Sequence, residues 1–426
     1  MLSNPLGLGI DLGTSGLRLA VVDSNGQLQA ECSADYPTRF EDPLGWREGL
    51  IALCGQLPEE LRAAVAAIAI DGTSGTVLLC RPDGALGPAP LAQALPYHQA
   101  CPEQAAAAAA LVGVEATQTP AASASGSLAR ALLLLELACT CGEPGPWWLR
   151  HQADWLMGWL LGDWSWGEES NNLRLGWDQV RSVWLGDLTR QPWSGALPRI
   201  CRSGQPLGPL GPIAAEALGL PVGSQVVAGS TDASAAALAA DLQPGDGATV
   251  LGTTLVLKQF SDQPLQGPGL SCQRVAGRWL VGGASNAGAG VLRRFFSDGQ
   301  LAELSRQIDP RRSSGLQLRP LPRRGERFPI DDPTLEPVLE PRPVSDARYL
   351  QGLLEGLAAI EREGWQRLEQ LGAPPVQRVI SLGGGARNPQ WRAIRQRLLQ
   401  RPVLNRPQCS AALGMAKLAL SAVATR

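Results

Sequence analysis

The feature that most constrains the fold is a small-residue turn that occurs twice, each time between two short β-like runs. The first turn, Gly-Thr-Ser at residues 13–15, separates runs at 6–11 and 17–23. The second, Gly-Thr-Thr at residues 252–254, lies within the β-like stretch 248–260. A hairpin that opens two distant sections predicts an internal duplication, and a chain of 426 residues is long enough for two cores.

Around these turns, β-like runs alternate with helical segments, which is typical of α/β proteins. We predict strands at residues 6–11, 17–23, 28–36, 63–70, 248–260 and 376–382, and helices at 100–112, 347–371, 389–399 and 411–422. The Trp-rich stretch 147–177 has the pattern of helices interrupted by Gly and Asp. Residues 311–345, rich in Arg and Pro, predict a long surface connection. We expect two domains, at residues 1–225 and 226–426.

Composition excludes several classes of function. A net charge of -2 provides no positive field to attract nucleic acid or an anionic membrane. No apolar run approaches the roughly 18 residues of a membrane span. His98 and His151 are the only histidines, which excludes a zinc-binding HExxH helix, and neither Lys258 nor Lys417 lies in a P-loop. A small-molecule partner is expected, with no nucleic acid and no membrane.

Cysteine usage and the start of the chain bear on the compartment. The 9 cysteines are scattered without a CxxC pair, which is typical of reduced thiols. The first β-like run begins at Leu6, which leaves no room for a cleaved leader. We therefore expect a cytoplasmic protein, or a chain from which a leader has already been removed.

The first turn has the chemistry of an anion-binding loop. Asp11 ends a β-like run, and the backbone N–H groups of the following turn can converge on an anion such as a metal-bound triphosphate. A dinucleotide-binding loop is disfavoured because a helix should start at the turn, whereas residues 17–22 have a β-pattern. An ordinary hairpin turn stays open for this loop alone. The turn at 252–254 and the glycines at 383–385, before a predicted helix, together favour a bound nucleotide.

Several motifs occur in a specific order along almost the whole chain. They are GIDLGTSGLR at 9–18, DGTSGT at 71–76, ADWLMGWLLGDW at 153–164, SNNLRLGWD at 170–178, AGSTDA at 228–233, LGTT at 251–254, GGASNAGAG at 282–290, GERFPIDDP at 325–333 and LGGGARNPQWR at 382–392. In this order the chain resembles the FGGY carbohydrate kinases of the sugar kinase, Hsp70 and actin superfamily. The resemblance implies two duplicated ribonuclease-H-like domains, each with a mixed five-stranded sheet, and an active-site cleft between them.

The resemblance also implies roles for particular residues. Asp232 would be the general base that accepts the proton of the attacking sugar hydroxyl, although Asp232 alone could simply cap a helix. Asp11 would help to hold Mg²⁺ and border the sugar, and Ser74 would contact the sugar. Residues implied in binding ATP are Thr14, Ser15, Gly252 and Thr253 at the phosphates, and Gly288, Leu292, Gly384, Gly385 and Asn388 at the adenosine. Asn388 could also cap the helix that starts at Pro389.

The implied reaction is the transfer of the γ-phosphoryl group of ATP, with Mg²⁺, to a ketopentose. The short pentulose-kinase branch favours D-ribulose, giving D-ribulose 5-phosphate. Family members carry an acidic element near position 99, which here is replaced by Tyr97, His98 and Gln99. Alternatives are therefore a xylulokinase or another FGGY sugar or polyol kinase, and a non-catalytic sugar- or nucleotide-sensing protein of the same fold.

Overall fold

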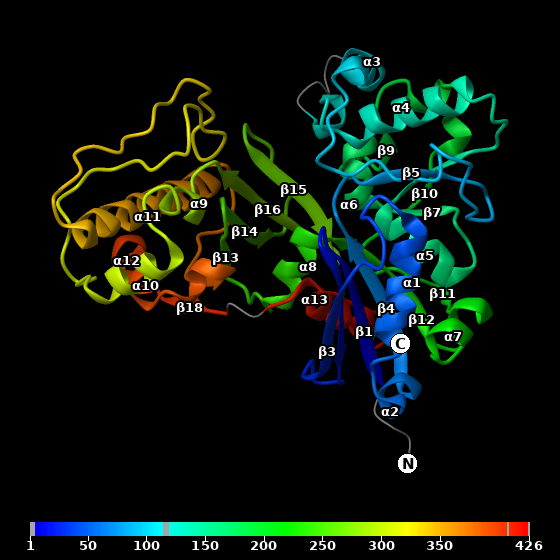
Figure 1. The fold of residues 1–426 in the computed structure, drawn as a ribbon, viewed down its shortest axis with the longest axis horizontal. Coiled ribbons are helices and arrows are strands. Elements are labelled where there is room, and N and C mark those ends of the chain that lie inside the picture. Colours follow the sequence, from blue (N-terminus) through cyan, green and yellow to red (C-terminus); the bar gives the residue numbers. More distant parts are fainter. Residues whose placement is uncertain (1–4, 114–118, 407–408, 425–426) are drawn as a thin grey trace. The chain divides into compact units, whose positions relative to one another are not determined.

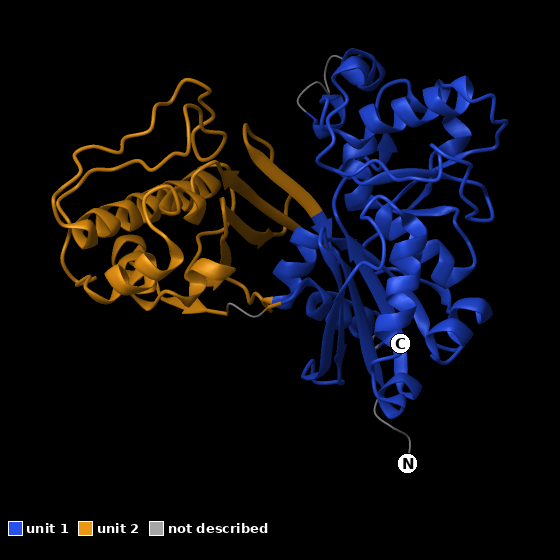
Figure 2. Ribbon diagram, in the orientation of Figure 1, with its two compact units in different colours: residues 1–239, 274–277, 410–426 blue, residues 240–273, 278–409 orange. Residues whose placement is uncertain are grey.

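A computed structural model describes residues 5–113, 119–406 and 409–424. Residues 1–4, on which the expectation of a missing leader depends, lie outside the described residues. The chain forms two compact units, shown in different colours in Figure 2: unit 1 comprises residues 1–239, 274–277 and 410–426, and unit 2 comprises residues 240–273 and 278–409. The sequence-based division at 225 and 226 falls inside a strand of unit 1.

Unit 1 is built on a six-stranded mixed sheet (Figure 1). In spatial order its strands are β11 (Pro206–Pro209), β12 (Gln225–Thr231), β4 (Val65–Gly72), β1 (Leu6–Leu12), β2 (Gly16–Val22) and β3 (Leu28–Asp35). β1 pairs antiparallel with β2 and parallel with β4, and β12 is parallel to β4.

Helices cover both faces of this sheet because β1 alternates large and small residues. Leu8, Ile10 and Leu12 enter a core with α1 (Pro43–Cys54), α5 (Gln152–Leu161) and α7 (Pro212–Leu218). On the other face, α8 (Asp232–Ala239) and α13 (Ala411–Ala424) pack on β4 and β12, and α13 also packs on β1. A Cβ added at Gly9 would lie 1.9 Å from the backbone oxygen of Ala412, so glycine permits this close approach.

The remaining elements of unit 1 are short and include an added layer after β4. They are α2 (Glu59–Ala63), β5 (Val77–Cys80), α3 (Pro102–Val112), α4 (Ser127–Thr140), β6 (Trp148–His151), β7 (Trp166–Glu168), α6 (Glu169–Asn172), β8 (Trp177–Asp178), β9 (Val183–Trp184) and β10 (Arg199–Cys201). The prediction of helices throughout 147–177 is therefore wrong at β6 and β7. β6 is a strand because it pairs with β5, and this pairing with a distant segment overrides the helical pattern of the local sequence.

Unit 2 repeats the same sheet topology. Its strands, in spatial order, are β15 (Leu270–Val275), β16 (Arg278–Ser285), β14 (Leu255–Ser261), β13 (Asp246–Leu251), β17 (Arg378–Leu382) and β18 (Val403–Asn405). β13 pairs antiparallel with β14 and parallel with β17, as β1 does with β2 and β4. Each sheet thus has six strands rather than the expected five, because one strand is added to the repeated five-strand pattern in each unit: β11 beside β12 in unit 1, and β15 at the opposite edge, beside β16, in unit 2.

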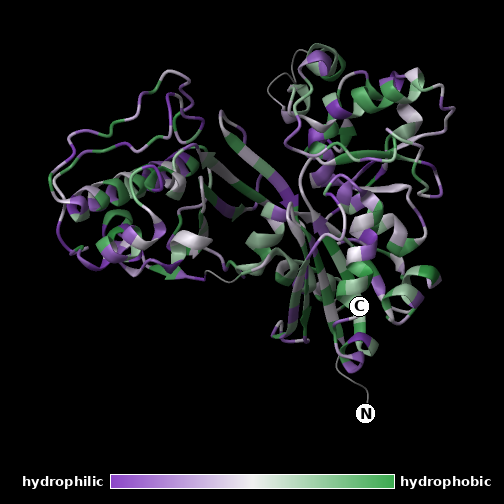
Figure 3. Ribbon diagram, viewed as in Figure 1, coloured by the Kyte–Doolittle hydropathy of each residue, from purple (hydrophilic) through white to green (hydrophobic). Residues whose placement is uncertain are grey.

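The helices of unit 2 are α9 (Ala289–Leu292), α10 (Asp298–Arg306), α11 (Asp346–Gln370) and α12 (Pro389–Leu399). α11 is amphipathic, with hydrophobic and polar residues alternating along it in Figure 3, and it buries Leu350, Leu353 and Leu357 in the core of this unit. Residues 311–345 form a long connection without a helix or an extended strand, as predicted.

Candidate active site

The strand ends of unit 1 bring three carboxylates to one region. Asp11 and Asp71 are register partners on the parallel strands β1 and β4. Asp232 directly follows β12, whose Thr231 is the register partner of Gly72. These are the carboxyl ends of three adjacent parallel strands, which is where open α/β sheets bind ligands.

Each carboxylate has different surroundings. Asp11 accepts a hydrogen bond from Nη1 of Arg18 at 2.9 Å. Asp232 is the first residue of α8, and its Oδ1 accepts a hydrogen bond from the backbone N–H of Ala233 at 2.7 Å. Asp71 is fully buried, and neither of its oxygens has a hydrogen-bond partner among the described residues. Asp71 is therefore the one of the three carboxyl groups without a hydrogen bond to the described residues.

The pKa values follow from these surroundings. Burial, and then the charges of Asp11 and Asp232, raise the pKa of Asp71 well above its ordinary value. Burial raises the pKa of Asp232 to about 6, although the Ala233 hydrogen bond and the nearby Arg174 lower it. At neutral pH most Asp232 side chains are still ionised and can accept a proton, as a general base requires.

Arg174 is a basic residue of this site that the sequence did not single out. It lies in the short 3-10 turn Leu173–Leu175 within the SNNLRLGWD motif. Its Cδ would be 3.2 Å from a Cβ added at Gly75, so its side chain passes next to the loop that carries Ser74. Burial lowers the pKa of Arg174, and the charge of Asp232 raises it. Arg174 has no hydrogen bond or ion pair with the rest of the described chain, so its guanidinium can meet a ligand.

The turn at residues 13–16 is closed and supported from behind. The Gly13 N–H donates to the Gly16 carbonyl at 2.9 Å, and the Tyr36 hydroxyl donates to the Gly13 carbonyl at 2.8 Å. Nε2 of Gln152 donates to the Tyr36 hydroxyl, and Oε1 of Gln152 accepts from the N–H and hydroxyl of Thr73. Gln152 thus links the turn at residues 13–16, through Tyr36, to the DGTSGT loop at residues 71–76.

The DGTSGT loop places Ser74 in a half-buried turn in front of Gly75, whose φ of 105° is left-handed. Arg130 holds this region together: its guanidinium donates to the carbonyls of Gly75, Tyr97, Gln99 and Ser125. This set of bonds occupies Arg130, whereas Arg174, whose Cδ lies near Gly75, makes no hydrogen bond or ion pair with the described residues.

The segment that departs from the family pattern reaches the site through Tyr97. The hydroxyl of Tyr97 lies 3.2 Å from the hydroxyl of Thr14, so the two share a hydrogen bond. His98 is exposed and stacks edge-on against Tyr97, with ring centroids 5.2 Å apart. Thr14 and Ser15 are themselves exposed. Of the three replacement residues, Tyr97 is the one joined to a predicted ligand residue.

In unit 2 the structure brings the second turn next to the Gly288 segment. The N–H groups of Ala289 and Gly290 donate to the carbonyls of Gly252 and Thr253, at 2.9 and 3.2 Å. A Cβ added at Gly288 would lie 2.4 Å from the Thr253 oxygen, so this contact requires glycine. The two segments therefore form one compact loop pair.

The other residues predicted to bind the adenosine differ in how accessible they are to a ligand. Gly385 packs under Leu251 and Trp391, while a Cβ at Gly384 would meet nothing within 4 Å. Asn388 caps α12: its Oδ1 accepts from the N–H of Trp391 at 3.0 Å, and its Nδ2 donates to Ser305. Leu292 is buried in the core and is only 4% exposed. Open backbone at Gly384 is thus the most accessible part of this set.

The residues present fit a cation that keeps most of its water. Within the described ranges no group of three or more His, Cys, Asp or Glu side chains is arranged to hold a metal ion. Mg²⁺ at a nucleotide is commonly bound by one or two carboxylates together with phosphates and water. Asp11, whose register partner Asp71 has no hydrogen-bond partner among the described residues, offers such a partial site.

Comparison with known proteins shows one family match and several similar folds. Residues 247–423 match the C-terminal domain of the FGGY family of carbohydrate kinases. The whole fold is similar to the xylulose kinase of Rhodospirillum rubrum, with a TM-score of 0.81 and 22% identity over 99% of this chain and 90% of that one. It is also similar to the glycerol kinase of Plasmodium falciparum, with a TM-score of 0.82 and 14% identity over 99% and 90% of the chains. The gluconate kinase of Lactobacillus acidophilus is similar to this chain with a TM-score of 0.78 and 18% identity, over 100% of this chain and 90% of that one.

The duplicated sheets thus give the chain a two-unit α/β fold that is similar to the fold of these solved kinase structures. Within that fold, the family match covers residues 247–423, the C-terminal part of the chain. The names of the similar structures cover different acceptors on one fold, so the fold leaves the acceptor open.

The structure adds Asp71, Arg174, Tyr36 and Gln152 to the site predicted from the sequence. Asp71 carried a sequence signal, since it ends a β-like run as Asp11 does. Arg174 carried none beyond its position in a family-like motif, because its proximity to Gly75 depends on how the segment after α5 folds back.

Among the described residues, no helix combines the length and the apolar character needed to cross a membrane. All 9 cysteines have free thiols.

Proposed function

We propose that this protein transfers the γ-phosphoryl group of ATP to the terminal hydroxyl of a ketopentose, D-ribulose in the first place, to give D-ribulose 5-phosphate. The observation that carries the proposal is the meeting of Asp11, Asp71 and Asp232 at three neighbouring strand ends, beside the Ser74 loop and the turn at 13–16. Carboxylates next to an anion-binding turn suit the deprotonation of a hydroxyl close to a phosphate.

In this proposal Asp232 accepts the proton of the sugar hydroxyl as that oxygen attacks the γ-phosphorus and the bond to ADP breaks. Ser74 and Asp11 orient the sugar, and Arg174 donates to an oxygen of the acceptor or of the transferring group. Thr14, Ser15, Gly252 and Thr253 line the phosphates, and Gly288, Leu292, Gly384, Gly385 and Asn388 surround the adenosine. Asp11 would help to hold Mg²⁺, which supplies charge neutralisation at the phosphates.

The acceptor is tested by measuring ADP release with Mg²⁺-ATP in the presence of ribulose, xylulose, ribitol, arabinitol or glycerol. We expect the highest kcat/KM with D-ribulose. A preference for xylulose, glycerol or a hexulose would support kinase activity but would contradict D-ribulose as the acceptor.

The role of Asp232 is tested by the Asp232→Asn variant. Removing the base should lower kcat by roughly 10²–10⁴-fold, with ATP affinity retained. Asp262→Asn is a matched control, because Asp262 is exposed and lies in unit 2. Equal turnover in Asp232→Asn and the native chain would contradict the assignment.

A second candidate is a sensor of the same fold that binds sugar or nucleotide without turnover. The altered segment at Tyr97, His98 and Gln99 is the observation that favours it. If no acceptor raises ADP release above the background ATPase, this candidate replaces the kinase.

A further inference from the structure

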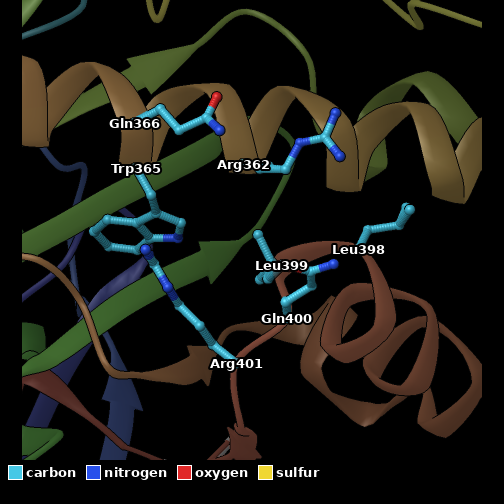
Figure 4. A pocket seen from close by; sticks show the side chains of 7 residues that line it. All are labelled: Arg362, Trp365, Gln366, Leu398, Leu399, Gln400 and Arg401. Atoms are coloured by element: carbon cyan, nitrogen blue, oxygen red, sulfur yellow. The ribbon is translucent and has the colours of Figure 1, made fainter.

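A hollow on the surface of unit 2 lies apart from the loops described above. It encloses about 360 Å³ between the C-terminal half of α11 and the end of α12 (Figure 4). Its lining residues are Arg362, Trp365, Gln366, Leu398, Leu399, Gln400 and Arg401. Asn388 and the adenosine loop are at the opposite end of α12, roughly 15 Å away along an eleven-residue helix. This volume is in the range of small-ligand sites.

The charged and polar groups of the hollow are rich in hydrogen-bond donors, and no carboxylate lines it. Arg362 is exposed and has no hydrogen bond or ion pair with any described residue. Arg401 has only a loose partner, since its Nη2 lies 4.0 Å from a carboxylate oxygen of Glu369. Two arginines that are weakly compensated favour an anionic ligand, and guanidinium groups are well matched to phosphate.

Trp365 is the most deeply buried aromatic side chain that lines the hollow. Its side chain is only 3% exposed, and the tip of its ring packs against Gly247 of β13. The indole N–H nevertheless has no hydrogen-bond partner among the described residues. In Figure 4 the side chain of Arg401 points toward this indole. A buried donor without a partner costs free energy unless a ligand or water satisfies it.

Gln400 contributes an unusual backbone conformation. It ends α12 with a φ of 54°, in the left-handed region where helix ends normally carry glycine. The side chain of Gln400, like that of Gln366, makes no hydrogen bond to the described residues. Carboxamides both donate and accept, which suits hydroxyl groups. A non-glycine residue kept in this conformation next to a cavity is consistent with a functional constraint.

We propose that this hollow is a second binding site of the protein, for a small phosphorylated sugar or polyol. Arg362 and Arg401 bind the phosphate and a further acceptor group of the ligand, and Gln366 and Gln400 bind its hydroxyls. Leu398 and Leu399 contact its carbon skeleton. If the proposed function holds, the reaction product belongs to this chemical class, and the site would let product concentration act on the enzyme away from the catalytic residues.

Calorimetric titration of the full chain without ATP tests this site. The probes are ribose 5-phosphate, inorganic phosphate and ribose, and the proteins are the native chain, Arg362→Gln, Arg401→Gln and the control Arg323→Gln, whose exposed arginine is outside the hollow. We expect ribose 5-phosphate to bind the native chain and the control, and to bind each hollow variant roughly tenfold more weakly or worse, as for loss of a charge-assisted hydrogen bond.

Inorganic phosphate should bind more weakly than ribose 5-phosphate, and ribose should not bind measurably. Equal affinity of all four proteins, or no binding of ribose 5-phosphate to the native chain, would overturn the site. If inorganic phosphate binds as tightly as ribose 5-phosphate, the sugar contributes nothing to binding, and the proposal of a sugar phosphate as the ligand is overturned. These outcomes do not depend on turnover, so they are separate from a failure of the kinase assay.

Discussion

The charge state of Asp232 determines the pH range in which it can act as a base. Burial raises the pKa of Asp232 to about 6, and below that value the carboxyl holds its proton and cannot accept one from a sugar hydroxyl. We therefore expect kcat/KM for the acceptor to fall as pH decreases through about 6. A pH–rate profile with saturating Mg²⁺-ATP measures this limb, and a flat profile between pH 5 and 7 would contradict Asp232 as the titrating base.

Arg174 provides an independent check on the same carboxylate. Its positive charge lowers the pKa of Asp232, so Arg174→Gln should move the acid limb of the profile to higher pH and also raise KM for the acceptor. Arg181→Gln is the control, because the Arg181 side chain is 69% exposed. A variant that loses activity equally at every pH would mean that Arg174 acts on structure alone.

The residues of the site differ in how well sequence reveals them. Asp11 and Asp232 each precede a glycine-rich or small-residue segment at the end of an apolar run, a pattern visible in one dimension. The pairing of Asp71 with Asp11 depends on strand register, and the proximity of Arg174 to Gly75 depends on a chain segment about a hundred residues later. Such contacts follow from tertiary structure and leave no local pattern.

At the scale of elements, a buried ion pair connects α11 and α12 to the sheet of unit 2. Arg395 donates to both oxygens of Glu361 at 2.6 Å, and both side chains are 0% exposed. Thr249 on β13 donates to Glu361, and Arg395 also donates to Ser381 on β17. Every charge in this network has a partner, which is the condition under which a buried pair is tolerated.

Replacing one partner should therefore be costly. Glu361→Gln leaves Arg395 buried and charged without a counterion, so we expect a loss of about 3–5 kcal/mol in the free energy of unfolding. Glu303→Gln removes an exposed partner of Arg306 and should cost about 0–1 kcal/mol. Urea denaturation followed by circular dichroism compares the two, and similar losses would show that the buried network is not specifically stabilising.

Elements with a strong periodic pattern agree with the sequence-based predictions. The predicted helix at 389–399 coincides with α12, where Pro389 is the first residue and Asn388 the cap. β6 and β7 were missed because three or four residues of strand, stabilised by β5 and β10 from elsewhere in the chain, carry too short a pattern. Length and a local cap make an element predictable, whereas dependence on a distant partner does not.

At the scale of the whole molecule, the two compact units are not two consecutive stretches of the chain. Both sheets repeat one topology, so the duplication expected from the two Gly-Thr turns is present. The chain nevertheless returns to unit 1 at residues 274–277 and 410–426. Sequence similarity between halves reveals the repeat, but it does not reveal which unit the last helix joins.

This discontinuity predicts the effect of a C-terminal truncation. A chain that ends at Cys409 lacks α13, whose Met415 and Ala419 are fully buried against β4 and α8, and whose Ala412 and Ala416 cover β1 and β2. Unit 1 should lose part of the helical cover of one sheet face, with α8 remaining on it, although the deleted residues follow unit 2 in sequence. Hydrogen exchange with mass spectrometry should therefore show faster exchange in β1 and β4, with β13 and β17 still protected. Loss of protection in β13 and β17 alone would mean that α13 stabilises unit 2, and the assignment of this helix to unit 1 would be wrong.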